Sequence, residues 1–344
     1  MIKKHYSKIM LIMIAVFTVL FAGSSSCASV SDRDIQKDDP GSNEAINKPL
    51  IDTAAGRIVR EMRVGWNLGN TLDAVGDWVN SSTPVNGLET MWVKEVTTRK
   101  TIDALKNAGF NSIRIPVSWS KCIDNNNIIR TDWMNRVIEI VNYAVENDMY
   151  ILLNSHHDEE IFKFMDKDMA ASLPKFIKIW EQIAEAFKDY DEKLVFEALN
   201  EPRTKKSANE WQGGTKQERD NLNKYYQAFV DTVRATGGNN SKRILMINTY
   251  AASAEMAAIN GLAIPSDTVE NSIIVSVHSY SPYNFALNTN KAFNKWSGSG
   301  ADKSDITNGI DRAYKKFVEN GIPVIIGEFG AMNKNNEETR AKWA

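Results

Sequence analysis

Cysteine is nearly absent from the sequence: the 344 residues include only Cys27 and Cys122. Because Cys27 lies in a segment with the features of a leader peptide, as described below, we expect only Cys122 in the mature chain. One cysteine cannot form an internal disulfide. The hydrophobic core must therefore stabilise the fold, even in an oxidising compartment.

The sequence also lacks an excess of either charge. It has 41 basic and 43 acidic residues, a net charge of −2 and a pI near 6.2. This balance offers no basic surface for nucleic acid and no field that would steer an anion, so it suits a neutral substrate. Close internal repeats are missing as well, which argues against a solenoid or a propeller.

Long apolar runs are missing except at the N-terminus. Lys3 and Lys4 precede the apolar residues 9–22, and small residues follow at 23–28, which is typical of a secretory signal peptide cleaved after Ala28. The apolar run is shorter than the roughly 20 residues that a spanning helix needs. We expect an extracellular, secreted protein. A lipoprotein anchored to a membrane at Cys27 is the less favoured alternative, because Ser24–Ser26 make a poor lipidation motif.

Residues 29–53 are rich in Asp, Ser, Asn, Pro and Gly and show no period, so we expect a linker or disordered arm. Residues 54–344 then read as one catalytic domain. Short apolar strands alternate with amphipathic helices, which predicts an α/β fold with a parallel sheet. The expected strands are 64–68, 112–116, 150–154, 194–199, 244–248, 273–277 and 324–327. The clearest helices are 97–107, 133–147, 173–187, 222–236 and 306–320.

The length and the alternation suit a (β/α)8 TIM barrel. Seven strands are one short of a closed barrel, and an open barrel would leave two unpaired edges. We therefore expect an eighth strand beyond Ala344, so that residues 54–344 form a C-terminally incomplete barrel.

Polar side chains follow the predicted strands at one rim, where barrel enzymes assemble their active sites. They are Arg114, His156, His157, Asn200, Glu201, His278, Tyr280 and Glu328. Two carboxylates across such a rim, Glu201 and Glu328, suit glycoside hydrolysis, in which one is a general acid and the other a nucleophile or base. Glu197 lies about 13 Å back along its strand, too deep for the rim, and is expected to be a buried structural partner.

Metal catalysis is the first alternative of another class. We expect no metal and no cofactor, because His156 and His157 are adjacent and would point to opposite faces of a strand. No spaced His-x-His motif follows the first predicted strand either.

At this point the chain resembles glycoside hydrolase family 5, and in particular its bacterial endoglucanase branch. The motifs that carry the resemblance are Ile-Arg-Ile-Pro at 113–116, Asn-Ser-His-His at 154–157, Asn-Glu-Pro at 200–202, His-Ser-Tyr at 278–280, Gly-Glu-Phe-Gly at 327–330 and the stretch 65–74. They cover residues 62–331 in order. The family's eighth-strand tryptophan, which lies beneath the sugar at the cleavage point, has no counterpart before Ala344.

The resemblance implies a retaining mechanism in which Glu201 is the acid/base and Glu328 the nucleophile. Retention needs the two carboxyl groups about 5–5.5 Å apart. Arg114 and Tyr280 would favour the ionised form of Glu328, whereas Glu201 must start protonated. Substrate binding falls to the remaining rim residues: Asn200 at the sugar's 2-hydroxyl, His156 and His278 as positioning groups, and His157 as a weaker candidate.

Tryptophans offer further sugar contacts. Trp180 has helical spacing from Phe176, Ile183 and Phe187 and is expected in the core. For Trp66, Trp119 and Trp296, stacking on sugar and ordinary packing both remain open.

The sequence thus predicts a secreted retaining endo-β-1,4-glucanase that hydrolyses cellulose or a related β-glucan. A xyloglucanase, lichenase, xylanase or mannanase on the same fold remains open. A non-catalytic carbohydrate-binding protein is the alternative of a different class, and it has no need of two rim carboxylates. The expected partner is the polysaccharide, with a cellulosome component or a binding module possible beyond residue 344, and no nucleic acid.

Overall fold

The computed structural model describes residues 51–80 and 82–344. The predicted signal peptide 1–28, Cys27 and most of the predicted linker 29–53 lie outside these residues. Seven parallel strands form one sheet in chain order, each paired with the next. They are β1 (Gly65–Asn67), β2 (Ser112–Ile115), β3 (Tyr150–Asn154), β4 (Leu194–Glu197), β5 (Leu245–Asn248), β6 (Ile273–Ser279) and β7 (Val324–Phe329).

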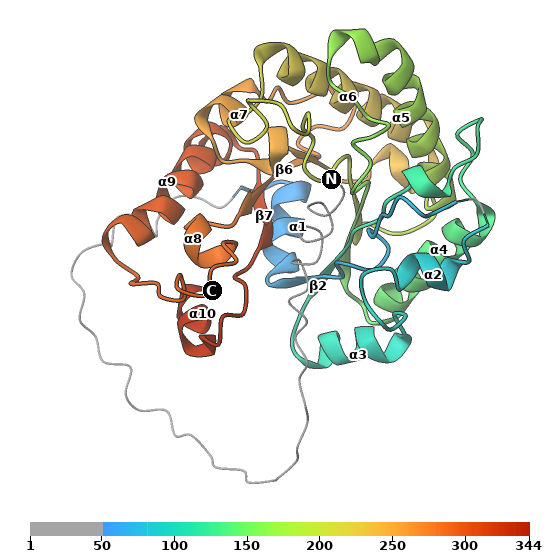
Figure 1. The fold of residues 1–344 in the computed structure, drawn as a ribbon. Helices are drawn as coiled ribbons and strands as arrows, with labels where there is room; N and C mark the ends of the chain where they lie inside the picture. Colours follow the sequence, from blue (N-terminus) through green and yellow to red (C-terminus); the bar gives the residue numbers. More distant parts are fainter. Residues whose placement is uncertain (1–50, 81) are drawn as a thin grey trace, which may run out of the picture.

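Helices surround the sheet, and together they make a nearly closed barrel (Figure 1). This confirms the predicted fold class and all seven strands. The α-helices are α1 (Ala54–Met62), α2 (Val85–Glu89), α3 (Arg99–Asn107), α4 (Thr131–Glu146), α5 (Asp166–Ala186), α6 (Lys216–Ala235), α7 (Met256–Gly261), α8 (Tyr283–Ala286), α9 (Gly300–Lys316) and α10 (Glu337–Trp343). Along the described chain, none of the helices has the length and apolar character needed to cross a membrane.

Three of the predicted helices begin six or more residues earlier than expected, and one of them, α9, starts at Gly300 rather than 306. Helix α5 starts at Asp166 rather than 173, and α6 starts at Lys216 rather than 222. The first turns of α5 and α6 are mostly polar, so hydrophobic periodicity does not reveal them. In α6 the start is specified by a cap instead: the Thr215 side chain accepts from the Glu218 backbone N–H, and Glu218 accepts in return from the Thr215 N–H.

The barrel interior has an apolar lower layer. Helix α1 lies in the middle of the ring of strands in Figure 1, at their N-terminal end. Its Ala55, Ile58 and Met62 pack against inward residues of four strands, which include Leu152, Val195, Met246 and Ile274. Burying this surface closes one end of the barrel and gives the opposite rim a rigid base.

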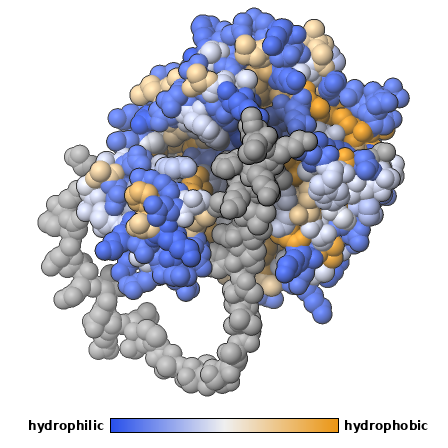
Figure 2. Space-filling model, viewed as in Figure 1, coloured by the Kyte–Doolittle hydropathy of each residue, from blue (hydrophilic) through white to orange (hydrophobic). Residues whose placement is uncertain are grey.

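The main core lies between the strands and the outer helices. Trp180 of α5 is fully buried there and contacts Phe196 and Phe229 edge-on or at a tilt, with ring centroids 5.6 and 4.5 Å apart. This confirms its predicted core position. The outer surface is mostly hydrophilic on the face shown in Figure 2, with small scattered apolar groups.

Candidate active site

All eight predicted site residues lie at or just beyond the C-terminal ends of strands. Arg114 is in β2, His156 and His157 follow β3, Asn200 and Glu201 follow β4, and Tyr280 follows β6. The expectation that His278 and Glu328 come after their strands is wrong. Strands β6 and β7 run on to Ser279 and Phe329. Within them His278 pairs with Glu328, next to a register shift between Val277 and His278.

Glu328 is held by two donors. Arg114 Nη1 lies 2.6 Å from one carboxylate oxygen, and the Tyr280 hydroxyl donates to the other at 2.8 Å. Burial raises the pKa of Glu328, but the positive charges of His278 and Arg114 and the Tyr280 hydrogen bond outweigh it. The pKa is lowered well below its ordinary range, so Glu328 is ionised at neutral pH.

Arg114 is fixed by a buried polar layer above the apolar one. Its Nε and Nη2 donate to the two oxygens of Glu197 at 2.6 and 2.9 Å, and Nη2 also donates to Asn200 Oδ1 at 2.8 Å. Glu197 is fully buried and also accepts from Asn154 and Asn248. The predicted role of Glu197 as a buried structural partner is confirmed, and its partner is the arginine that holds Glu328.

His278 lies between the two candidate carboxylates. Its Nδ1 is 3.0 Å from Glu201 Oε1 and 3.6 Å from Glu328 Oε2. Burial lowers the pKa of His278, but the negative charges of Glu328 and Glu201 leave it above its ordinary value. One oxygen of each glutamate and one nitrogen of His278 all lie within 4.8 Å of one another. The two carboxylates therefore approach each other closely, although Glu201 follows β4 and Glu328 lies in β7.

His156 and His157 do not point to opposite faces, so that argument against a metal site is wrong. Both follow the end of β3 at Asn154, where strand alternation no longer applies, and their ring centroids are only 4.5 Å apart. With Asp73 they bring three possible ligand atoms within 4.8 Å, as do Glu201, His278 and Glu328. The expectation of a metal-free site remains a prediction.

His156 is buried 4.0 Å from Glu328 Oε1, and Asn154 contacts its Nδ1 at 3.1 Å. Burial and the nearby positive charges hold the pKa of His156 well below its ordinary value, so its imidazole is uncharged at neutral pH. His157 is less buried and packs near Trp92, with centroids 5.6 Å apart. His156 thus borders the space beside Glu328, and His157 packs against His156.

Sequence reasoning missed two residues of the site. Asn67 at the end of β1 accepts from Arg114 Nη1 at 3.0 Å and donates to the Gly327 carbonyl at 3.0 Å, which links β1 to β7. Arg203 donates to Glu201 Oε2 at 3.2 Å. The sequence held one signal for each of them: Asn67 is a polar residue at the end of a predicted strand, and Arg203 is a basic residue two positions after the expected acid. Trp119, by contrast, is fully buried and has no face for a sugar.

The comparisons with known proteins agree with this arrangement. A family model described as cellulase (glycosyl hydrolase family 5) matches residues 72–344. The chain belongs to glycosyl hydrolase family 5. The resemblance seen in the sequence motifs is thereby confirmed.

Family 5 relatives named endoglucanases share much of this chain. Endoglucanase A of Clostridium longisporum is 45% identical over 293 residues, which cover 85% of the chain. The chain spans 56% of the length of that relative.

Solved family 5 structures superpose closely. A broad-specificity endoglucanase from Ruminococcus champanellensis with bound cellotriose has 45% identity and a TM-score of 0.80, over 85% of this chain and 84% of that one. A lichenase from Caldicellulosiruptor sp. F32 has 41% identity and a TM-score of 0.81, over 86% and 83% of the two chains.

Proposed function

We propose that the protein is an endo-β-1,4-glucanase that hydrolyses cellulose or related β-glucans with retention of configuration. The observation that carries this proposal is the carboxylate pair: Glu201 and Glu328 approach within 4.8 Å, and Arg114, Tyr280 and His278 surround Glu328 with donors and charge. Relatives named endoglucanases support the reaction class. A non-catalytic carbohydrate-binding protein has no use for such a pair.

In the proposed reaction Glu328 attacks the anomeric carbon while Glu201 protonates the leaving oxygen. A covalent glycosyl-enzyme forms, and Glu201 then removes a proton from the water that hydrolyses it. A short carboxylate separation supports retention, since inversion needs about 6.5–9.5 Å for an intervening water. Tyr280 can keep donating to Glu328, because burial and the charge of Glu328 raise the pKa of its phenol well above the ordinary value.

The remaining predicted residues take binding roles in this proposal. Asn200 is buried, and its Oδ1 is occupied by Arg114, so its orientation is fixed beside the carboxylate pair. We assign it the sugar's 2-hydroxyl. His156 lies beside Glu328 and His157 packs against His156, and we assign both to substrate positioning.

We also propose that the protein acts outside the cell. The support is the N-terminal sequence alone: two lysines, an apolar stretch and small residues before a cleavage position at Ala28. N-terminal sequencing of protein recovered from the culture medium tests this, and a chain retained in the cell with residues 1–28 intact would overturn it.

Activity on a panel of polysaccharides tests the reaction and the substrate. We expect hydrolysis of carboxymethyl cellulose and lichenan, with a rapid fall in viscosity because internal bonds are cut. The related structures include a broad-specificity enzyme and a lichenase, so xyloglucan, xylan and mannan belong in the panel. Dialysis against EDTA should leave the activity unchanged, because no step asks for an ion. No hydrolysis of any β-glucan would contradict the proposal, and loss restored by zinc would favour a metal mechanism.

A further inference from the structure

Arg203 lies behind Glu201 in a nearly closed cluster of charges. Its side chain is only 10% exposed. Nη1 donates to Glu201 Oε2 at 3.2 Å and to the Glu201 backbone carbonyl at 2.9 Å. The residue therefore holds both ends of Glu201, the side chain and the main chain.

Two further carboxylates share the same guanidinium. Glu159, which follows β3, accepts from Nη1 at 3.3 Å, and Glu210 accepts from Nε at 3.1 Å. The Glu159 side chain is 8% exposed, and its other oxygen lies 3.0 Å from Lys205 Nζ. Arg203 thus faces three carboxylates, and only part of its field acts on Glu201.

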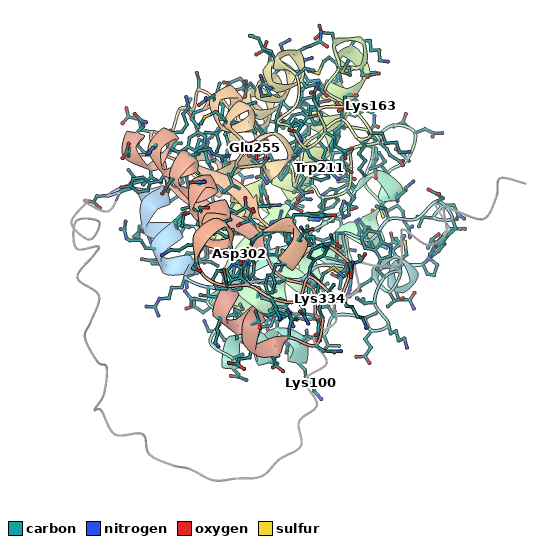
Figure 3. The ribbon with its side chains drawn as sticks, turned by 60° about the vertical axis from the view of Figure 1, so that its left-hand side comes forward. Lys100, Lys163, Trp211, Glu255, Asp302 and Lys334 are labelled. Atoms are coloured by element: carbon teal, nitrogen blue, oxygen red, sulfur yellow. The ribbon has the colours of Figure 1, made fainter. Side chains whose placement is uncertain are left out.

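The cluster is anchored on its other sides. The Trp211 ring covers the guanidinium, with its centroid 4.6 Å from Arg203 Cζ. Trp211 is labelled in Figure 3 and comes from the segment between β4 and α6. The backbone around Arg203 is tied down as well: the Pro202 carbonyl accepts from Ala251 N–H at 2.9 Å, and Thr204 N–H donates to the Tyr250 hydroxyl at 2.8 Å. Arg203 has little freedom to move away from Glu201.

We propose that Arg203, balanced by Glu159 and Glu210, is a positioning residue that orients Glu201 and sets the pH at which Glu201 loses its proton. This inference rests on the proposed role of Glu201 as acid/base. An unopposed arginine at this distance would favour the ionised form of Glu201 and so work against a general acid. The two extra carboxylates offset that charge while the geometry of the arginine is kept.

Other titratable groups also face Glu201, and they are the same in all the variants tested. They are His278 in β6, Tyr280 after β6 and Glu328 in β7. The substitutions at Arg203 and Glu159 therefore change the charge on one side of Glu201 and leave the groups on its other side as they are.

The experiment measures kcat/KM against pH for the wild type, Arg203→Gln, Arg203→Lys and Glu159→Gln on the best polysaccharide of the panel. The alkaline limb is the part of the pH profile in which kcat/KM falls as Glu201 loses its proton. Removing the positive charge of Arg203 should move this limb to higher pH by about 0.5–1 pH unit, because the protonated acid is favoured. Glu159→Gln should move the limb downward, because Arg203 then acts on Glu201 less opposed. Arg203→Lys should keep the limb near that of the wild type.

A leaving-group comparison separates positioning from general damage. Arg203→Gln should lower kcat about tenfold or more on polysaccharide, where the leaving oxygen needs a well-placed proton. KM should change little, and the loss should be much smaller for an aryl cellobioside whose leaving group departs unaided. If Arg203→Gln does not fold, the downward shift in Glu159→Gln still tests the charge balance.

Arg57→Gln is the matched control. Arg57 is paired with Glu61 and Glu192 at the opposite end of the barrel, so its replacement should leave the limb unmoved. The inference would be overturned if the alkaline limb of Arg203→Gln and of Glu159→Gln fell at the same pH as that of the wild type. It would also be overturned if the two variants shifted the limb in the same direction. Failure of the proposed function is distinguishable, because Glu201→Ala would then show no dependence on the leaving group.

Discussion

Arg114 divides one guanidinium between a fully buried carboxylate, Glu197, and a partly exposed one, Glu328. The buried partner fixes the position of Arg114, and the remaining Nη1 faces the rim. A charge held in this way needs no rearrangement when Glu328 attacks, which is how preorganised sites lower a barrier. Burial lowers the pKa of Arg114, but the two glutamates raise it above its ordinary value, so the positive charge is permanent.

The lowered pKa of Glu328 makes a prediction about acid stability. An unfolded glutamate takes up a proton near pH 4.3, whereas folded Glu328 stays ionised to lower pH. Its contribution to the free energy of unfolding is therefore present above about pH 4.3 and is lost as the pH falls through the folded pKa. Glu328→Gln should therefore lose less stability in acid than the wild type. Urea unfolding between about pH 3 and 7, where carboxylates take up protons, measures the difference.

Glu270→Gln, at an exposed position, is the control and should follow the wild-type acid dependence. If the free energy of unfolding fell equally with pH in the wild type and in Glu328→Gln, the partners of Glu328 would not stabilise its ionised form.

The sequence was sufficient to find the two glutamates and their immediate neighbours, because each sits at a strand end and strand ends meet at one rim. It was insufficient for Arg203, whose contacts with Glu159 and Glu210 depend on how two loops fold against each other. The error on His156 and His157 has a similar origin. Strand alternation was applied to residues that lie beyond β3, where the chain is free to turn both rings toward the same space.

At the scale of elements, the segments after β6 and β7 are joined by a buried lysine. Lys334, labelled in Figure 3, is 4% exposed, and its ammonium donates to the carbonyls of Asn284, Phe285 and Phe293 at 2.9, 2.6 and 3.0 Å. The first two carbonyls belong to the short helix α8, so Lys334 also caps that helix. Two further hydrogen bonds join the same two segments. Met332 N–H donates to the Ala286 carbonyl, and Trp343 Nε1 donates to the Ser281 carbonyl.

Lys334→Met should therefore destabilise the protein. The methionine keeps most of the apolar contact but leaves buried carbonyls without a donor, at a cost of about 2–3 kcal/mol in the free energy of unfolding. Because Tyr280 and Glu328 lie at the base of these two segments, kcat should fall as well. Chemical denaturation and kinetics measure the two effects.

Lys216→Met is the matched control, since this lysine is largely exposed and forms its ion pair with Asp220 on the surface. An equally small change in both variants would mean that the carbonyls around Lys334 find other donors.

Element boundaries show where sequence patterns stop being informative. The strands were found almost to the residue because their apolar runs are buried on both faces, as in β3 and β4. Helix α5 continues through its internal Pro174 and starts eight residues before it, at Asp166, in a first turn that is polar except for Met169. Neither feature has an apolar period, so only packing and caps define that end.

At the scale of the whole molecule, the barrel separates stability from chemistry. The apolar layer closed by α1 lies at one end, and the polar layer of Arg114, Asn154, Glu197 and Asn248 lies above it. Every polar contact of Glu197 is made inside this layer, so the carboxylate that anchors Arg114 is remote from solvent. The seven described strands supply this arrangement, and the residues that contact Glu201 and Glu328 come from the segments at β2, β3, β4 and β6.

The central claim is that Glu201 and Glu328 divide the two chemical roles, and azide product analysis tests it most directly. With an aryl β-cellobioside, Glu201→Ala should still form the glycosyl-enzyme, and azide should intercept it without a general base. A second inversion at the same carbon then gives a β-glycosyl azide, identified by NMR. Glu328→Ala should give no such product. A β-azide from the Glu328 variant but not from the Glu201 variant would contradict the assignment and reverse the two roles.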